Sequence, residues 1–219
     1  KWANAVIENA TQPSTYKTEA YYLAAQAHYR IHQYPQAIAQ LQCYLQQPNI
    51  AESTNKTTAL YLHAYALFNQ KDFATAEPIF RQYVAAMGNN TANTTYADAL
   101  NRIGDCLFQA REFQQASDVY HQVAELKSNG ADYAILQQGY AQGLLHHYAE
   151  KAAVLTSLIE QYPRSDYADD AMYEIARAQL QQNKNEDAIH TYQQLLKKYP
   201  NSSQAPKSSL ELGMTYRTT

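Results

Sequence analysis

Small and large apolar residues recur along this chain at the spacing of helix faces. In several segments an alanine is followed four residues later by a large apolar residue, and this spacing places both on one face of a helix. Twelve residues before that alanine a second small residue recurs, which lets two antiparallel helices approach closely. The sequence therefore predicts a series of helix pairs. The alanines that mark the second helices are Ala37, Ala76, Ala116, Ala152 and Ala188.

Turn residues divide this pattern into predicted helices. Tyr-Pro pairs close two of the second helices, because proline cannot continue a helix. Ser53, Asp72 and Ser165 are expected N-caps, since their side-chain oxygens can accept a bond from the first turn. Continuous Val, Ile and Thr runs, which a buried sheet would need, are missing. The predicted helices span residues 1–10, 19–32, 35–47, 54–70, 73–87, 92–110, 113–127, 131–146, 148–161, 166–182, 185–198 and 204–217.

The helix pairs form a repeat. Successive marker alanines are 39, 40, 36 and 36 residues apart, close to the roughly 34 residues of a tetratricopeptide unit. The fourth pair fits less well, because Gly139, Ala141 and Gly143 bracket the expected small position. This indicates a one-residue slip in its turn. Stacked pairs of this kind bury their core between neighbours, so stability is roughly additive along the stack.

The five pairs resemble tetratricopeptide repeats over nearly the whole chain. The resemblance implies an all-α fold, a right-handed α-α superhelix, and a single solenoid domain over residues 1–219. Both ends read as partial helices, so we expect a fragment of a longer chain. The expected repeats cover residues 19–48, 54–87, 96–127, 131–162 and 166–199, with another starting from 204.

The later repeats carry a more specific pattern. The segment YPRSDYADDAMYEIARAQLQQNKNEDAIHTYQQLLKKYPNSSQAPKS is similar to the Tyr-Pro-x-Ser-x-x-Ala-x-x-Ala units of bacterial envelope proteins. These include the Tol–Pal system coordinator and the lipoprotein of the outer-membrane barrel-assembly machine. The resemblance implies a scaffold in the periplasm or attached to the outer membrane. A cytoplasmic location stays open.

In this family the first helix of each repeat lines the inner, concave surface. Tyr61, Tyr65 and Phe68 lie on one helix face and offer a large contact area at low conformational cost. They could form the floor of a groove for a peptide or a partner helix, or they could pack between repeats. A second reading is that the aromatic face binds a glycan or peptidoglycan fragment. The expected binding residues are Tyr22, Tyr29, Tyr61, Tyr65, Phe68, Asn101, Asp105, Phe108, Tyr173 and Arg177.

Charge and motifs narrow the function classes. The net charge is −3, with 17 Lys+Arg and 20 Asp+Glu interspersed, which argues against a nucleic-acid partner. No apolar run reaches the roughly 20 residues that span a bilayer, so we expect no membrane insertion. No phosphate loop, nucleophile elbow or zinc-protease motif occurs.

Candidate ligands for a metal are equally sparse. His146 and His147 are adjacent and point to different helix faces. Cys43 and Cys106 lack metal-type spacing to a histidine. We expect both to be buried thiols that act as small hydrophobes, in preference to a disulfide bond between them. The sequence therefore predicts a non-enzymatic protein with no metal or cofactor, which binds a protein partner.

Overall fold

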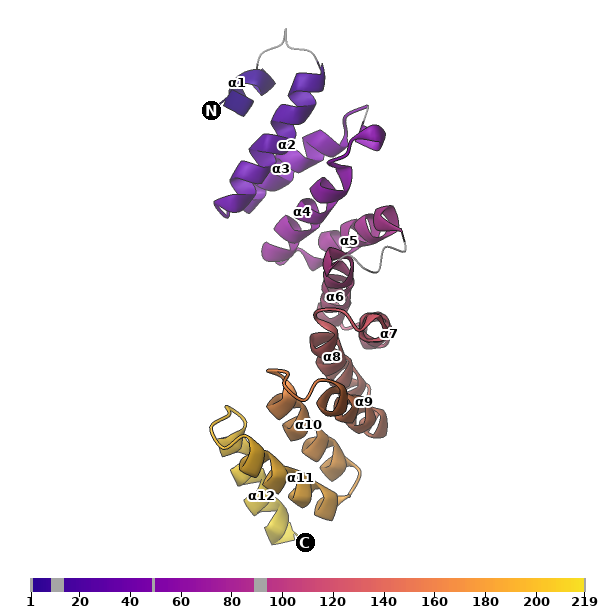
Figure 1. The fold of residues 1–219 in the computed structure, drawn as a ribbon, viewed down its shortest axis with the longest axis vertical. Helices are drawn as coiled ribbons and strands as arrows, with labels where there is room; N and C mark the ends of the chain where they lie inside the picture. Colours follow the sequence, from indigo (N-terminus) through magenta and orange to yellow (C-terminus); the bar gives the residue numbers. More distant parts are fainter. Residues whose placement is uncertain (1, 9–13, 49, 89–93, 219) are drawn as a thin grey trace. The chain divides into compact units, whose positions relative to one another are not determined.

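The computed structural model describes residues 2–8, 14–48, 50–88 and 94–218, and these residues form twelve α-helices and one short 3-10 helix (Figure 1). The predicted all-α class and all twelve predicted helices are confirmed. Parts of the first and sixth predicted helices, residues 1, 9, 10, 92 and 93, lie outside the described residues. The helices are α1 (Trp2–Glu8), α2 (Ser14–Arg30), α3 (Tyr34–Leu45), η1 (Ile50–Glu52), α4 (Lys56–Asn69), α5 (Phe73–Met87), α6 (Thr94–Gln109), α7 (Phe113–Leu126), α8 (Ala131–Leu144), α9 (Tyr148–Gln161), α10 (Ala168–Gln181), α11 (Asn185–Lys198) and α12 (Ala205–Thr218).

The chain divides into two compact units, Lys1–Ala110 and Arg111–Thr219. The first holds α1 to α6 and the second holds α7 to α12. Within each unit every helix packs against the next one in the sequence. Because the connecting turns are short, neighbouring helices run antiparallel. The single solenoid domain over residues 1–219 stays a prediction.

A residue in the left-handed conformation marks the turn inside each helix pair. Such residues are strained unless they are glycine or asparagine. In the second pair, Asp72 next to this residue donates its backbone N–H to the Leu67 carbonyl at 3.0 Å, the bond that closes a Schellman motif. The turns therefore share one geometry, and they give the repeat register independently of the small residues. The five residues are His32 (φ 58°), Lys71 (φ 61°), Arg111 (φ 64°), His146 (φ 62°) and Asn183 (φ 59°).

Buried small and large residues follow this register in four of the five pairs. The marker alanines Ala37, Ala76, Ala116 and Ala188 have no exposed surface, and neither do the large residues that follow each of them. The buried positions therefore follow the spacing that the sequence predicted.

The fourth pair is the exception, and the prediction of Ala152 as its marker is wrong. Lys151 stands five residues after His146, as Ala37 does after His32, and it is 7% exposed. Leu155 then takes the large position and is fully buried. The physical reason is the slip anticipated in this turn, which shifts α9 by one residue.

One of the three predicted N-caps is confirmed. The Asp72 side chain accepts the backbone N–H of the third residue of α5 at 3.2 Å. The predictions for Ser53 and Ser165 are wrong, because the N-caps are Asn55 and Tyr167. Each serine oxygen instead accepts the backbone N–H two residues on, at 3.3 and 3.2 Å. Serine forms such turns readily, so both helices begin two residues later than a serine cap allows.

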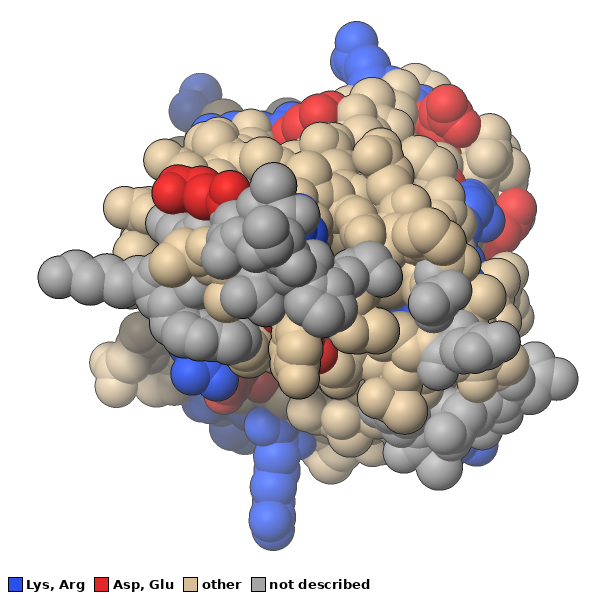
Figure 2. All heavy atoms as spheres, turned by 90° about the horizontal axis from the view of Figure 1, so that it is seen from above, with Lys and Arg blue, Asp and Glu red and all other residues tan. Residues whose placement is uncertain are grey.

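The surface shows no segregation of charge on the face drawn in Figure 2, where charged side chains of both signs lie among uncharged ones. Among the described residues, no helix combines the length and the apolar character that crossing a membrane requires. The same residues contain no group of three or more His, Cys, Asp or Glu that could hold a metal ion.

Candidate functional site

A hollow of about 380 Å³ lies in the second unit over α8, α10 and α12. These are the first helices of three successive pairs, the helices that the resemblance assigned to the inner surface. Tyr173 and Arg177, two of the predicted binding residues, line it. The lining residues are Tyr140, Asp170, Tyr173, Glu174, Arg177, Gln204, Lys207 and Glu211.

Two cations lie near the Tyr173 ring. The Arg177 guanidinium is 5.8 Å from its centroid, and the Lys207 ammonium is 6.0 Å from it. Both distances fall within the range of cation–π attraction. Burial raises the pKa of the Tyr173 hydroxyl. Burial together with three carboxylates, Asp170 first, raises the pKa of the Tyr140 hydroxyl to about 12. Both tyrosines therefore present neutral hydroxyls at neutral pH.

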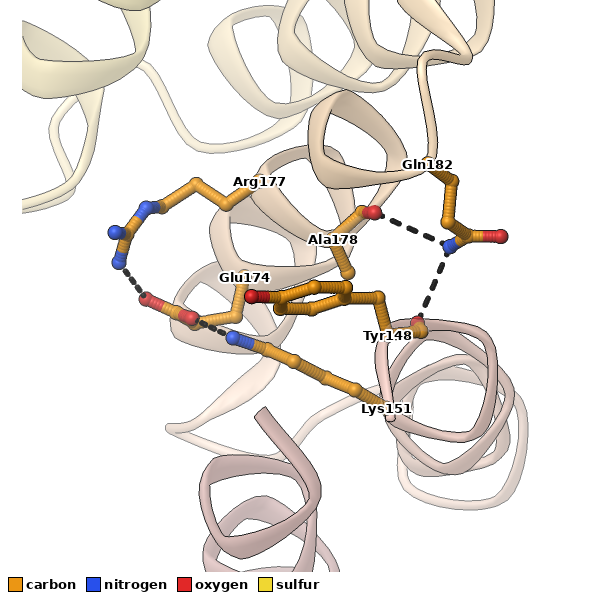
Figure 3. Close-up of polar contacts among 6 residues, drawn as sticks. All are labelled: Tyr148, Lys151, Glu174, Arg177, Ala178 and Gln182. Atoms are coloured by element: carbon orange, nitrogen blue, oxygen red, sulfur yellow. Dashed lines mark hydrogen bonds and ion pairs between the residues drawn. The ribbon is translucent and has the colours of Figure 1, made fainter. Parts of the chain in front are cut away.

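Glu174, which lines the hollow, belongs to a buried ion pair (Figure 3). The Lys151 side chain runs from α9 to α10, where its ammonium donates to one oxygen of Glu174. Arg177 Nη1 donates to the other oxygen at 3.0 Å. The Lys151 and Glu174 side chains are 9% and 10% exposed, whereas the Arg177 side chain is 53% exposed. Glu174 thus links the buried Lys151 to Arg177, which is exposed in the hollow.

Two glycines of α8 make room for this arrangement. A Cβ atom on Gly139 would lie 2.5 Å from Leu155 Cδ2, and one on Gly143 would lie 3.0 Å from Lys151 Cδ. Real Cβ atoms do not approach as closely as the first distance, so a side chain at position 139 would require Leu155 to move. The second distance is tight, and a side chain at position 143 would require the Lys151 side chain to shift slightly. Gln182 Nε2 also joins α10 to α9, since it donates to the carbonyls of Tyr148 and Ala178, each at 3.1 Å (Figure 3).

Some polar groups of the hollow have partners and others do not. Gln204 Nε2 donates to Asp170 Oδ1 at 2.5 Å, and Lys207 Nζ donates to Gln204 Oε1 at 3.2 Å. Among the described residues, the Glu211 carboxylate and the hydroxyls of Tyr140 and Tyr173 have no hydrogen-bond or ion-pair partner. The hollow therefore offers free donors and acceptors on rigid helices.

The predicted aromatic cluster of the first unit, Tyr61, Tyr65 and Phe68, is also brought together. The Tyr61 hydroxyl donates to Asp98 Oδ2 at 2.6 Å, and the Tyr65 hydroxyl donates to the same oxygen. All three rings lie within 6.5 Å of Phe80, centroid to centroid. Burial, followed by the Asp98 carboxylate, raises the pKa of both tyrosines. Both hydroxyls are thus engaged between α4 and α6.

Arg102 of α6 completes this cluster. Its guanidinium lies 5.4 Å from the Phe68 ring centroid, and its Nη1 pairs with Asp105 at 2.6 Å. The three aromatic residues are each partly exposed. The cluster therefore makes packing contacts between α4 and α6, which belong to neighbouring repeats. That it also forms the floor of a groove for a partner stays a prediction.

The other predicted binding residues occupy varied environments. Tyr22 is 6% exposed, with its ring 5.2 Å from that of Tyr44, and Asn101 is 3% exposed. Tyr29 and Phe108 are partly exposed. Tyr22 and Asn101 are therefore core positions in the first unit.

Sequence reasoning missed most of the hollow. Glu211 and Lys207 lie on α12, which the sequence predicts only as the start of an incomplete repeat, so the inner-surface positions predicted for the other repeats do not include it. Asp170 and Glu174 lie at inner positions of α10 that the register did not include. The signal was available, because Ser202 and Ala205 repeat the spacing of Ser165 and Ala168.

Comparisons with known proteins agree on the architecture. Residues 22–91, 133–165 and 170–202 match the tetratricopeptide repeat family, and together these segments make up more than half of the chain. No curated protein sequence matches the chain.

Several solved structures are similar to this one. YrrB, described as a tetratricopeptide repeat protein with an unusual peptide-binding site, is 17% identical, with 95% of this chain and 98% of that chain covered and a TM-score of 0.69. MamA from Desulfovibrio magneticus RS-1 is 15% identical, with 85% and 97% covered and a TM-score of 0.66. The apo form of RapI is 10% identical, with 95% and 60% covered and a TM-score of 0.73. At these identities the similarity shows the fold alone.

Proposed function

Since the chain is built from tetratricopeptide repeats, we propose that it is a non-catalytic scaffold that binds a segment of a partner protein. The observation that carries the proposal is the hollow over α8, α10 and α12, with its exposed Arg177, its free Glu211 carboxylate and its two free tyrosine hydroxyls. Repeat folds host many functions, so the site, not the fold, carries the proposal.

The chemistry of the hollow suits a peptide. An extended backbone presents alternating N–H and C=O groups, and the hollow supplies acceptors for the first and donors for the second. Tyr140 and Tyr173 add contact area with few rotatable bonds, which keeps the entropic cost of binding low. The helices hold these groups in place before binding, so little ordering is needed. Peptide binding is described for YrrB, and we extend it to this chain.

The cluster of Tyr61, Tyr65 and Phe68 is the second candidate surface. The hydroxyls of Tyr61 and Tyr65 already donate to Asp98. A ligand at this cluster would therefore contact the aromatic rings but would not receive a hydrogen bond from these hydroxyls. We therefore rank it below the hollow. The two surfaces lie in different units and can be tested separately.

We further propose that the scaffold works in the bacterial envelope, in the periplasm or at the outer membrane. The support is the Tyr-Pro-x-Ser spacing at residues 162–165 and 199–202, which resembles envelope repeat proteins. Fractionation of the source cells with an antibody against this chain tests the location. Recovery in the cytoplasmic fraction alone contradicts it.

A glycan or peptidoglycan fragment is the alternative ligand. Tyr173 could stack on a sugar ring while Asp170 and Gln204 bond its hydroxyls, since all three line the hollow. A glycan array discriminates the two proposals, because selective, saturable binding on it favours the glycan.

Affinity capture from envelope extracts tests the scaffold proposal. The parent chain is compared with a Tyr173→Ala/Arg177→Ala variant, a Tyr61→Ala/Tyr65→Ala/Phe68→Ala variant, and an exposed control, Lys197→Ala. We expect a partner that the first variant loses and the control retains. A partner lost only by the triple variant moves the site to the first unit, and no enriched partner contradicts the proposal.

A further inference from the structure

Lys151 occupies the marker position of its repeat. The other four repeats have a fully buried alanine at this position, namely Ala37, Ala76, Ala116 and Ala188. Burying an ammonium group is costly, and a hydrophobic residue of similar size is often as stabilising as a buried ion pair. The shifted α9 also packs tightly against two glycines of α8, and at Gly139 a Cβ atom would lie 2.5 Å from Leu155 Cδ2. Stability alone therefore does not explain why this repeat contains a lysine.

The contacts of Glu174 supply an explanation. Lys151 binds one carboxylate oxygen and Arg177 binds the other. Without Lys151, the carboxylate and the Arg177 guanidinium would form a neutral pair. With Lys151, the three groups carry one net positive charge. Because Lys151 and Glu174 are buried and Arg177 is exposed, that charge reaches solvent at Arg177, inside the hollow.

The facing helix offers the opposite charge. Lys207 and Asp170 are both bound to Gln204, which links them into a group with no net charge. Glu211 lines the same hollow and has no hydrogen-bond or ion-pair partner among the described residues. The hollow therefore contains one uncompensated cation, at Arg177, and one uncompensated carboxylate, at Glu211.

We infer that Lys151 is a positioning residue that leaves Arg177 free to bind an acidic side chain of the partner, while Glu211 binds a basic side chain of the same segment. The inference rests on the proposed function and specifies its ligand. The partner segment is a peptide with an acidic and a basic residue close together. Arg177 retains further N–H donors beyond the one that Glu174 accepts, so it can also hold a carboxylate.

Three variants separate charge from structure. Lys151→Met keeps the length of the side chain and reduces the net charge of the three groups to zero. Lys151→Met/Glu174→Gln removes the buried ion pair but restores one net positive charge at Arg177. Glu211→Gln removes the second uncompensated charge and leaves the ion pair in place. Circular dichroism melting first checks that each variant is folded.

The probe is a random 12-residue peptide library displayed on phage, selected in parallel on the parent chain and on each variant. We expect the parent to enrich peptides that carry both an acidic and a basic residue. Lys151→Met loses the enrichment of acidic residues, and the double variant regains it. Glu211→Gln loses the enrichment of basic residues only.

Calorimetry with the peptide most enriched on the parent gives the magnitude. A charge-assisted hydrogen bond is worth enough that its loss weakens binding about tenfold, so we expect that loss in Lys151→Met and recovery in the double variant. If Lys151→Met enriches peptides with acidic residues as the parent does, the inferred role of Lys151 in freeing Arg177 is contradicted. If the parent enriches peptides without charge preference, the ligand class is wrong but peptide binding stands. If it enriches no peptide, the proposed function fails as well.

Discussion

Acid should destabilise the first unit through His63, which lies in α4 and is only 5% exposed. Neither ring nitrogen has a hydrogen-bond partner among the described residues. Burial disfavours the imidazolium and lowers the pKa of His63 from 6.5 to about 4. Since the folded pKa lies below the unfolded one, the unfolded chain binds the proton first. Stability from this residue is therefore intact above about pH 6.5 and falls as the pH drops toward about 4.

The size of the effect follows from these two pKa values. Between about pH 7.5 and pH 5 the linkage relation gives a loss of about 2 kcal/mol in the free energy of unfolding. A His63→Leu variant has no such proton and should lose about 2 kcal/mol less than the parent over this interval. Leucine suits the site, because Ile103 and Ile175 occupy the same place before the small residue in other repeats.

Urea denaturation followed by far-ultraviolet circular dichroism measures both proteins at both pH values. The difference between the two pH dependences cancels the contribution of all other titrating groups. Repeat arrays can unfold in stages, so amide hydrogen exchange in α4 provides a local check. Equal pH dependence in parent and variant would refute the reasoning and indicate that His63 reaches solvent or a partner.

Three further outcomes follow from the backbone and the core. Lys71→Gly should stabilise the chain by about 0.5–1 kcal/mol in urea melts, because glycine relieves the left-handed strain; lower stability would contradict this. Gly139→Ala should destabilise it by about 1–3 kcal/mol, because the new methyl group collides with buried Leu155, and an unchanged midpoint would show that α9 can move. Both cysteines are free thiols, but Cys43 is partly exposed, so the prediction that it is buried is wrong, and Cys106 is buried. A thiol reagent should therefore modify Cys43 in the native protein but not Cys106, whose pKa burial raises to about 12. Equal rates for the two thiols would contradict that contrast.

The helices could be predicted because the same local physics sets them in every repeat. Small residues on one face and large residues four positions later specify close packing of neighbours, and Asp72 as an N-cap follows from its side-chain oxygen. The prediction of Ser53 and Ser165 as N-caps was wrong because a serine hydroxyl accepts a backbone N–H of its own turn as easily as one of a helix. Ser53 and Ser165 do the former, and nothing in the local sequence distinguishes the two outcomes.

The candidate site was harder to predict. The recurring alanine points to Ala152 and not to Lys151, because a lysine at a small position is recognised only through its distant partner, Glu174. The glycines of α8 were the visible sign that this repeat is remodelled. The aromatic cluster was found easily, since Tyr61 and Tyr65 share a helix face, but their bonds to Asp98 depend on how α4 and α6 pack.

The central claim is that the hollow over α8, α10 and α12 binds a partner segment, and cross-linking from the hollow tests it most directly. A photo-reactive phenylalanine analogue replaces Tyr173 in one protein and exposed Tyr216 in a control, and each is irradiated in envelope extract of the source cells. The account predicts a discrete cross-linked partner from position 173, mapped by mass spectrometry to one segment that carries acidic and basic residues, and none of it from position 216. The same products from both positions, or none from position 173, would contradict it.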